Sequence, residues 1–297
     1  MVWNIKGTVI ENAKMSKYTS MRVGGPVRYL IYPSDFQDLI EVLKILNGEG
    51  IEWRILGNGT NVIVSDKGLQ GAIIRLTRIR RLSIRRNGDN IKVFVSSGYQ
   101  LKDLILKMAS LNLSGIERLY SIPGTVGGAI KMNAGSFGVS ISDAIVSVTC
   151  MSASGEIFKL SKRNLNFSYR YSSIPSKTLI IEAEISLKYG DRQRIIGVID
   201  EVLSERIKRH PMDMPSSGSI FKAVRGIPAW TYIEKANLKG LRVGDACVST
   251  KHANFIVNLG RAKAYEVKSL IEKIKKEVYE KEGVELEEEV EFWGFDD

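Results

Sequence analysis

Histidine and cysteine are scarce in this sequence of 297 residues, which contains two of each. Cys150 and Cys247 lie far apart in the chain, which excludes a disulfide framework and a metal site built on closely spaced cysteines. With only His210 and His252 to add, a His/Cys zinc site or a His-based catalytic triad has almost no residues from which to form. We therefore expect no metal, and chemistry that depends on other side chains.

Long apolar runs are also missing. No uninterrupted apolar segment approaches the roughly 20 residues that cross a bilayer. The N-terminal residues show neither a basic head followed by an apolar stretch nor a small-residue cleavage site, which argues against a secretory signal. Because 44% of the residues are hydrophobic, the chain can still bury a core. We expect a cytoplasmic globular protein with no membrane-inserted segment.

Positive charge is what the sequence has in excess. It contains 43 Lys and Arg residues against 33 Asp and Glu residues, a formal net charge of +10. A positive field concentrates anions, so this charge fits a nucleic acid, a polyanionic small molecule or merely a basic surface. Aromatic residues are not interleaved with runs of Lys and Arg, and no recognition helix is visible, which argues against a nucleic-acid partner.

Apolar periodicity predicts a mixture of strands and helices, and the length suggests about two domains. A Pro- and Ser-containing segment at residues 212–218 is the candidate domain boundary. A helix after Ser34, with Ser34 as its N-cap, is expected to end near Gly48. Strands are expected at residues 29–32, 53–56, 62–64, 72–76, 93–97, 145–151, 179–187, 255–259 and 284–293, and further helices at residues 100–113, 195–210, 228–237 and 264–278.

A first glycine-rich segment, Gly57-Asn58-Gly59-Thr60-Asn61, lies between two predicted strands. Glycines there let the backbone approach a ligand closely and leave amide N–H groups free to bond phosphate oxygens. It is not a dinucleotide-binding fingerprint, because Val62 stands where the third glycine should be and a strand follows where a helix is needed. No P-loop pattern occurs either. An ordinary turn is the alternative interpretation.

A second glycine-rich segment lies at residues 121–135. No charged residue occurs from Leu119 to Ile130. Alternating apolar residues and glycines indicate main chain packed against a flat or extended ligand. Together with the first segment, this predicts a diphosphate-containing cofactor held by the backbone. A buried connector under a sheet is the alternative.

Six motifs then occur in a familiar order, at residues 19–26, 57–61, 121–135, 169–172, 218–222 and 249–255. Together they closely resemble the UDP-N-acetylenolpyruvoylglucosamine reductase family, flavoenzymes of peptidoglycan precursor synthesis. The resemblance covers residues 19–294, nearly the whole chain. The short ending after Glu289-Val290 and the lack of a long insertion are similar to the family's type II branch.

The resemblance implies an α+β fold with a two-lobed FAD-binding region of the vanillyl-alcohol-oxidase (PCMH-type) class, at residues 1–76 and 77–210. A C-terminal α+β substrate-binding domain is implied at residues 211–297, with a last strand (about 284–294) that returns toward the active site. The cofactor-binding residues implied by the motifs are Arg22, Gly24, Gly25, Gly57, Asn58, Gly59, Thr60, Asn61, Ser121, Pro123, Gly124, Thr125, Gly127, Gly128, Ala129, Asn133 and Gly135.

The activity implied is a flavin-dependent oxidoreductase reaction on a CH–CH bond. NADPH, the co-substrate, gives hydride to noncovalently bound FAD, and the reduced flavin passes it to UDP-N-acetylglucosamine enolpyruvate to form UDP-N-acetylmuramate. No obligate protein partner is implied. A rival within the same fold is another flavin-dependent oxidoreductase, which uses oxygen and a different alcohol or acid.

The resemblance also implies the roles of individual side chains. Ser219 matches the proton donor, Arg170 matches the residue that holds the substrate carboxylate as it becomes enolate-like, and Glu289 matches the acidic partner. Lys222 and Tyr169 match substrate-binding positions. Without the resemblance, Ser219 would be interpreted as part of a flexible linker and Arg170 as a stacked surface residue. Glu289 would be interpreted as part of a solvated acidic face, because strand alternation puts Glu285, Glu287 and Glu291 on the same side as Glu289.

Three departures from the family pattern stand out. Glu291 replaces the usual arginine after Glu289-Val290, and would raise the pKa of Glu289 if both face the site. Ala223-Val224 replaces a polar residue and proline, which puts one substrate contact in doubt. Ser136-Phe137 replaces a small residue and tyrosine, so that a hydroxyl is lost and the ring is kept. None of these changes removes a catalytic position.

Overall fold

The computed structural model describes residues 3–88, 90–175 and 177–295. The chain forms two compact units, and it passes between them several times. Unit 1 contains Met1–Glu11, Tyr29–Asn58 and Gly71–Ser204, and unit 2 contains Asn12–Arg28, Gly59–Gln70 and Glu205–Asp297. The domain boundaries expected after residues 76 and 210 stay predictions.

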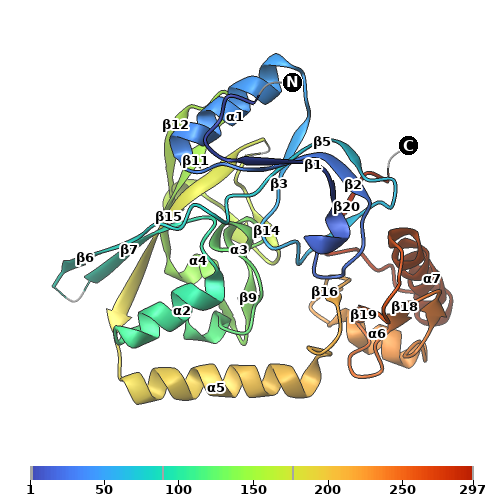
Figure 1. Cartoon of the computed structure of the whole chain (residues 1–297). Helices are drawn as coiled ribbons and strands as arrows, with labels where there is room; N and C mark the ends of the chain where they lie inside the picture. The colour runs from blue at the N-terminus through green and yellow to red at the C-terminus, as the bar shows by residue number, and fades with distance from the viewer. Residues whose placement is uncertain (1–2, 89, 176, 296–297) are drawn as a thin grey trace. The chain divides into compact units, whose positions relative to one another are not determined.

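The larger sheet of unit 1 is antiparallel, with strand order β12-β11-β15-β7-β6 and β8 paired with β15 (Figure 1). The helix α2 (Leu101–Ser110) contributes Leu104, Ile105 and Met108 to the buried core of this part. These residues recur at helical spacing, so one face of α2 is apolar. The strands are β6 (Leu82–Asn87), β7 (Asn90–Ser96), β8 (Leu113–Ser114), β11 (Ile145–Met151), β12 (Ile157–Ser161) and β15 (Leu179–Tyr189).

A second sheet has strand order β1-β2-β5-β3, formed by β1 (Thr8–Lys14), β2 (Pro26–Tyr32), β5 (Leu69–Ile74) and β3 (Trp53–Ile55). The helix α1 (Phe36–Gly48) buries an apolar stripe in a separate core of unit 1. Its N-cap is Asp35, whose carboxylate accepts the backbone N–H of Asp38 at 2.8 Å. The expectation that Ser34 caps this helix is therefore wrong, because the helix begins one residue later.

Unit 2 holds an antiparallel sheet with strand order β16-β19-β18-β17, formed by β16 (Ser216–Ser219), β19 (Phe255–Asn258), β18 (Ala246–Val248) and β17 (Arg242–Val243). The helices α6 (Ala229–Lys235) and α7 (Ala264–Glu282) belong to the same unit and contribute to its core (Figure 1). The apolar positions of α7 predicted from the sequence, Val267, Leu270, Ile271, Ile274 and Val278, are all buried.

The last strand is shorter than expected. Only β20 (Glu291–Trp293) forms, parallel to β4 (Val62–Val64), while Glu288 makes an isolated bridge to Phe221. The expected strand over residues 284–293 is therefore wrong in its extent. The segment before β20 pairs by a few backbone hydrogen bonds with the chain around Phe221 instead of continuing one ladder.

The long helix α5 (Arg192–Arg209) is close to its predicted extent.

Several short elements, by contrast, have no periodic signal in the sequence, because two to six residues are too few to show one. The short elements are η1 (Met15–Lys17), η2 (Glu117–Leu119), α3 (Val126–Lys131), β9 (Gly135–Ser136), β10 (Val139–Ser140), α4 (Ile141–Ala144), η3 (Lys162–Asn164), β13 (Phe167–Ser168) and β14 (Tyr171–Ser172).

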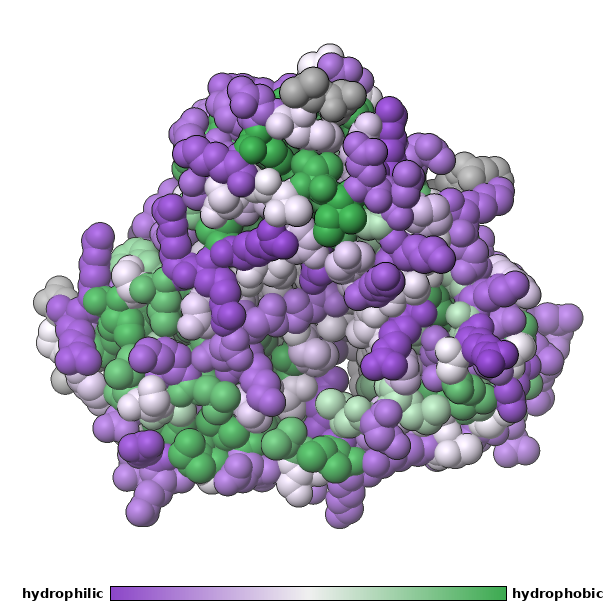
Figure 2. All heavy atoms as spheres, viewed as in Figure 1, coloured by the Kyte–Doolittle hydropathy of each residue, from purple (hydrophilic) through white to green (hydrophobic). Residues whose placement is uncertain are grey.

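Hydrophilic residues predominate on the face of the molecule shown in Figure 2, with apolar residues in smaller groups between them. This surface is consistent with the excess of Lys and Arg in the sequence. No helix among the described residues is long and apolar enough to cross a membrane.

Candidate active site

The first glycine-rich segment begins in unit 1, where Gly57 is held by Arg75. The Arg75 guanidinium donates two hydrogen bonds to the Gly57 carbonyl, from Nε at 3.1 Å and from Nη2 at 2.8 Å. Its Nη1 donates to the Tyr32 hydroxyl at 3.0 Å. A Cβ at residue 57 would lie 2.7 Å from Oγ1 of Thr125. Glycine at this position therefore lets the loop contact the second glycine-rich segment.

The two glycine-rich segments are also joined through Gln100. The side-chain amides of Asn58 and Gln100 form a reciprocal pair, with Asn58 Nδ2 donating at 2.5 Å and Gln100 Nε2 donating at 3.1 Å. Gln100 makes a backbone bridge with Thr125, and the N–H of Leu101 donates to the Gly124 carbonyl at 3.0 Å. Unit 1 thus brings together the expected cofactor residues from Gly57 to Asn58 and from Gly124 to Thr125.

Gly127 lies directly against Ser97. Its backbone N–H donates to the Ser97 carbonyl at 2.8 Å, and a Cβ at residue 127 would lie 2.7 Å from Cβ of Ser97. The hydroxyls of Ser97 and Ser121 are buried and have no hydrogen-bond partner among the described residues. Unsatisfied buried hydroxyls are unfavourable, so a polar ligand would stabilise this region. These orphaned groups beside closely packed main chain fit a cofactor bound along residues 121–128.

Asn133 uses its side chain within unit 1. It is buried, with φ +42°, and its Nδ2 donates to the Ser168 carbonyl at 2.9 Å while its Oδ1 accepts the Ser142 N–H at 3.3 Å. Gly135, in the hairpin of β9 and β10, packs against the main chain, because a Cβ there would lie 2.9 Å from the Val139 carbonyl oxygen. Both residues shape the chain that follows α3.

Tyr169 and Arg170 form the two-residue turn between β13 and β14. Arg170 has φ +55°, an uncommon conformation for a residue other than glycine. Its guanidinium carbon lies 4.9 Å from the centroid of the Tyr169 ring, which is itself 57% exposed. Asn133 anchors this hairpin at Ser168, and the Ser172 hydroxyl donates to the Lys131 carbonyl at 2.7 Å. Arg170 therefore lies at the tip of a well-anchored hairpin of unit 1.

In unit 2, the remaining glycines of the expected cofactor site are explained by packing of the chain on itself. Gly59 has φ +64°, and a Cβ there would lie 2.4 Å from the Tyr18 carbonyl oxygen. Gly24 has φ +123° and lies against Met15 and Val64. Gly25 lies against the carbonyl of Asp66. Arg22, also at positive φ, is exposed beside these glycines.

Ser219, Lys222 and Glu289 lie on adjacent segments of unit 2. Ser219 ends β16 opposite Phe255 and is half-buried. The Glu289 N–H donates to the Ile220 carbonyl at 2.7 Å, and the Lys222 N–H donates to the Glu287 carbonyl at 2.9 Å. The side chain of Lys222 also forms an ion pair with Glu287. The structure thus brings the three predicted residues onto paired main-chain segments.

Asn61 fixes the C-terminal segment in unit 2. Its Nδ2 donates to the Glu289 carbonyl at 3.0 Å, and its own carbonyl accepts the Glu291 N–H at 2.9 Å. Glu291 accepts a hydrogen bond from Nε1 of Trp293 at 3.0 Å and is exposed. Asn61, expected as a cofactor contact, therefore also holds the backbone that carries Glu289.

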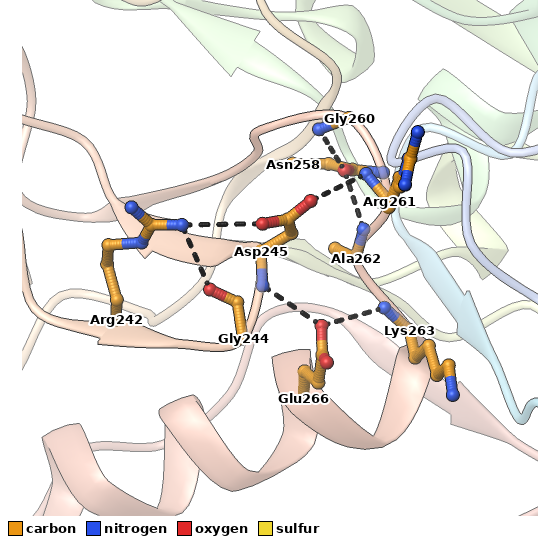
Figure 3. Close-up of polar contacts among 9 residues, drawn as sticks. All are labelled: Arg242, Gly244, Asp245, Asn258, Gly260, Arg261, Ala262, Lys263 and Glu266. Carbon is orange, nitrogen blue, oxygen red and sulfur yellow. Dashed lines mark hydrogen bonds and ion pairs between the residues drawn. The ribbon is translucent and has the colours of Figure 1, made fainter.

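A polar network around Asp245 and Glu266 fixes the start of α7 in the same unit (Figure 3). The Glu266 carboxylate accepts the backbone N–H groups of Asp245 and Lys263, each at 3.1 Å. Asp66 accepts the next two helix N–H groups, those of Ala264 and Tyr265, each at 3.0 Å. Carboxylates here satisfy N–H groups that a helix N-terminus leaves unpaired. The network thus joins Asp245, the residue before β18, to the N-terminus of α7.

Two family models match this chain. The C-terminal domain of UDP-N-acetylenolpyruvoylglucosamine reductase matches residues 210–293, and an FAD binding domain matches residues 27–161. The UDP-N-acetylenolpyruvoylglucosamine reductase of Syntrophus aciditrophicus is 39% identical over 293 residues, which cover 98% of this chain and 94% of that relative. The chain belongs to the UDP-N-acetylenolpyruvoylglucosamine reductase family.

Other relatives agree with this assignment. The reductase of Caldicellulosiruptor saccharolyticus is 40% identical over 288 residues, covering 96% of this chain and 92% of that relative. The crystal structure of the reductase (MurB) from Thermus caldophilus matches with a TM-score of 0.81 and 32% identity, over 97% of this chain and 99% of the other. The expected α+β fold, with an FAD-binding domain and the family's C-terminal domain, is confirmed. The PCMH-type class stays a prediction. The type II assignment stays a prediction.

Four residues with structural roles at these sites escaped the sequence interpretation. Arg75, Ser97 and Gln100 support the glycine-rich segments of unit 1. Asn254 supports the segment after Ser219 in unit 2. The only signal for Asn254 is its place in the 249–255 motif, because its partners are backbone atoms that no side-chain pattern reveals.

Among the described residues, no group of three or more His, Cys, Asp and Glu residues could hold a metal ion.

Proposed function

We propose that this member of the family catalyses the NADPH-dependent, FAD-mediated reduction of UDP-N-acetylglucosamine enolpyruvate to UDP-N-acetylmuramate, in the cytoplasm and without an obligate protein partner. The observation that carries the proposal is the pairing of the Ser219–Lys222 and Glu287–Glu289 segments within unit 2. A hydroxyl, an ammonium and a carboxylate thus lie on two main-chain segments joined by backbone hydrogen bonds, in a chain whose relatives are named UDP-N-acetylenolpyruvoylglucosamine reductase.

In unit 1, FAD would be bound by the backbone of residues 57–58 and 121–129 and by Asn133 and Gly135. In unit 2, the family motifs assign Arg22, Gly24, Gly25 and residues 59–61 to the same cofactor. The chemistry that bound FAD would supply is the transfer of hydride from NADPH to one carbon of the enolpyruvyl double bond. The second carbon then gains electron density and needs a proton to complete the reduction. The buried hydroxyls of Ser97 and Ser121 would find a hydrogen-bond partner in the cofactor.

Ser219 would donate that proton from Oγ. A serine hydroxyl is a weak acid, so it can protonate only a strongly basic carbanion, and only if its alkoxide is stabilised. Lys222 follows in the same segment and carries the positive charge that this needs. Its ion pair with Glu287 restrains the ammonium group. Glu289 acts in the same half-reaction as the acidic partner.

Arg170 would bind the substrate carboxylate. A planar guanidinium forms two parallel hydrogen bonds with a carboxylate, and its charge stabilises the enolate that develops there. The Tyr169 ring beneath the guanidinium limits its orientations. Tyr169 itself is exposed and available for contact with the substrate.

The substitution Ser219→Ala tests the proton-donor role in rapid-mixing experiments. FAD binding and flavin reduction by NADPH should stay within about threefold of wild type, whereas flavin reoxidation by the enolpyruvyl substrate should slow about 100- to 10,000-fold. Ser216→Ala, in the same strand, is the matched control and should leave both steps unchanged. Reoxidation of Ser219→Ala at the wild-type rate would exclude Ser219 as the donor, and equal slowing of both steps would indicate a damaged flavin site.

A further inference from the structure

Asn254 is an amide buried beside the chain that follows Ser219. The residue is 6% exposed, and its side chain forms two hydrogen bonds with the backbone of one residue, Phe221. The Phe221 N–H donates to Oδ1 of Asn254 at 2.9 Å, and Nδ2 of Asn254 donates to the Phe221 carbonyl at 2.8 Å. The side chain thus satisfies both backbone groups of Phe221, whose own side chain is fully buried.

This contact begins where the β-ladder ends. The pairing of β16 with β19 is irregular between Ser216 and Ser219, and Gly218 there has φ +78°. The last paired residues are Ser219 and Phe255, after which the Ile220 N–H donates to the Asn254 carbonyl at 2.9 Å. The side chain of Asn254 then takes the place of a ladder partner for Phe221. Ser219 is therefore fixed between a ladder pair and an amide clamp.

The other edge of the clamped segment pairs with the segment that carries Glu289. The Ile220 carbonyl accepts the Glu289 N–H, and the Lys222 N–H donates to the Glu287 carbonyl. Phe221 and Glu288 form an antiparallel bridge between these two hydrogen bonds. A displacement of residues 220–222 would therefore move Ser219, Lys222 and Glu289 together.

We propose that Asn254 is a positioning residue for the proton donor Ser219 and, through the Ile220 carbonyl, for Glu289. The inference rests on the proposed function. It requires no contact between Asn254 and the substrate, because Asn254 acts through the backbone of Phe221. Both donor and acceptor of the amide are required. A carboxylate of the same size can accept from the Phe221 N–H but cannot donate to the Phe221 carbonyl.

The test uses Asn254→Asp in the full-length, FAD-loaded protein. FAD binding and flavin reduction by NADPH should stay within about threefold of wild type. Reoxidation of the reduced flavin by UDP-N-acetylglucosamine enolpyruvate should slow about 10- to 100-fold, the size of loss that a small misplacement of a reacting group produces. If Asn254→Asp does not fold, Asn254→Ser is measured instead; its single hydroxyl cannot replace both amide atoms that bond Phe221, so the same selective slowing of reoxidation is expected.

Asn258 provides the matched control. It ends β19, the strand that begins directly after Asn254, is 3% exposed and also bonds backbone groups through its amide, accepting the N–H groups of Gly260 at 2.8 Å and Ala262 at 3.0 Å (Figure 3). None of its side-chain hydrogen bonds among the described residues reaches residues 220–222. Asn258→Ala should lower the unfolding temperature without selectively slowing reoxidation.

A double-variant cycle separates positioning from a loss of general stability. If Asn254 acts through Ser219, most of the slowing caused by Asn254→Asp should vanish when Ser219 is already alanine. Full additivity of the two losses would overturn the proposal, as would reoxidation of Asn254→Asp at the wild-type rate. Failure of the wild-type protein to be reoxidised by this substrate would instead contradict the proposed function, so the two failures are distinguishable.

Discussion

The rings of His210 and His252 stack in unit 2, with centroids 4.8 Å apart and planes inclined by 20°. Both rings also contact Phe255, the residue that pairs with Ser219. Burial lowers the pKa of each histidine to about 4, and the nearby charge of Arg206 adds to the effect on His210. For His252, Lys239 lowers the pKa further, while Glu234 opposes the shift.

This pair predicts a loss of stability in mild acid. An unfolded histidine takes up a proton near pH 6.5, whereas the folded pair does so only near pH 4, so unfolding binds protons between these values. The free energy of unfolding should therefore fall as the pH drops from 6.5 toward 4, and the pair should add no pH dependence above 6.5. Urea unfolding at a series of pH values measures this.

Because the chain contains only these two histidines, the variant His210→Gln/His252→Phe isolates their contribution. Its stability should change less than that of wild type between neutral pH and mild acid. The carboxylate of Glu184, bonded to Lys159, Lys92 and Ser147, has its pKa lowered from 4.5 to about 2, so the stability that it contributes is lost mainly below pH 4.5, at the acid end of this range. An unchanged slope in the double variant would contradict the assignment.

The flavin should be released by acid, because no cysteine is available to hold it covalently. Cys150 and Cys247 are both buried outside the glycine-rich segments, and burial raises the pKa of the Cys150 thiol to about 11. Burial also raises the pKa of Cys247. Precipitation with acid followed by absorbance of the supernatant checks this. Yellow colour retained in the washed pellet would contradict noncovalent binding.

Arg170→Lys should be severely impaired although the charge is kept. A lysine ammonium cannot form two parallel hydrogen bonds with a carboxylate. We expect flavin reoxidation by substrate to slow about 100-fold or more, with flavin reduction by NADPH near normal. Arg163→Lys, at an exposed position of η3, is the control and should behave as wild type. Normal reoxidation in Arg170→Lys would make Arg170 a structural residue only.

Gly127→Ala should weaken FAD binding and lower stability, because the added methyl would lie 2.7 Å from Cβ of Ser97. Overpacking of this kind typically costs about 1 to 3 kcal/mol. Gly197→Ala in α5 is a suitable control, since no atom lies within 4 Å of its added Cβ. That change should stabilise the protein by about 0.5 to 1 kcal/mol, as expected for glycine replaced in a helix. Thermal unfolding and flavin titration of both variants decide the question; unaltered flavin affinity in Gly127→Ala would contradict this account.

The sequence predicts the long helices well because burial imposes a helical period on their apolar residues, as in α2 and α7. It misses the β13–β14 hairpin, since strands of two residues have no period. The clamps made by Asn133 and Asn254 are also hidden, because each joins a side chain to backbone atoms distant in sequence, 35 and 33 residues away. The order of the motifs identified the residues of the candidate site, but only the fold shows which segments pair.

Anaerobic mixing of NADPH-reduced protein with UDP-N-acetylglucosamine enolpyruvate measures directly whether this substrate reoxidises the flavin. The reduced, bleached flavin should regain its visible absorbance in a single turnover, with one equivalent of UDP-N-acetylmuramate formed for each flavin oxidised. A flavin that stays reduced with this substrate, and is reoxidised only when oxygen is admitted, would contradict the account and favour another flavin-dependent oxidoreductase of the same fold.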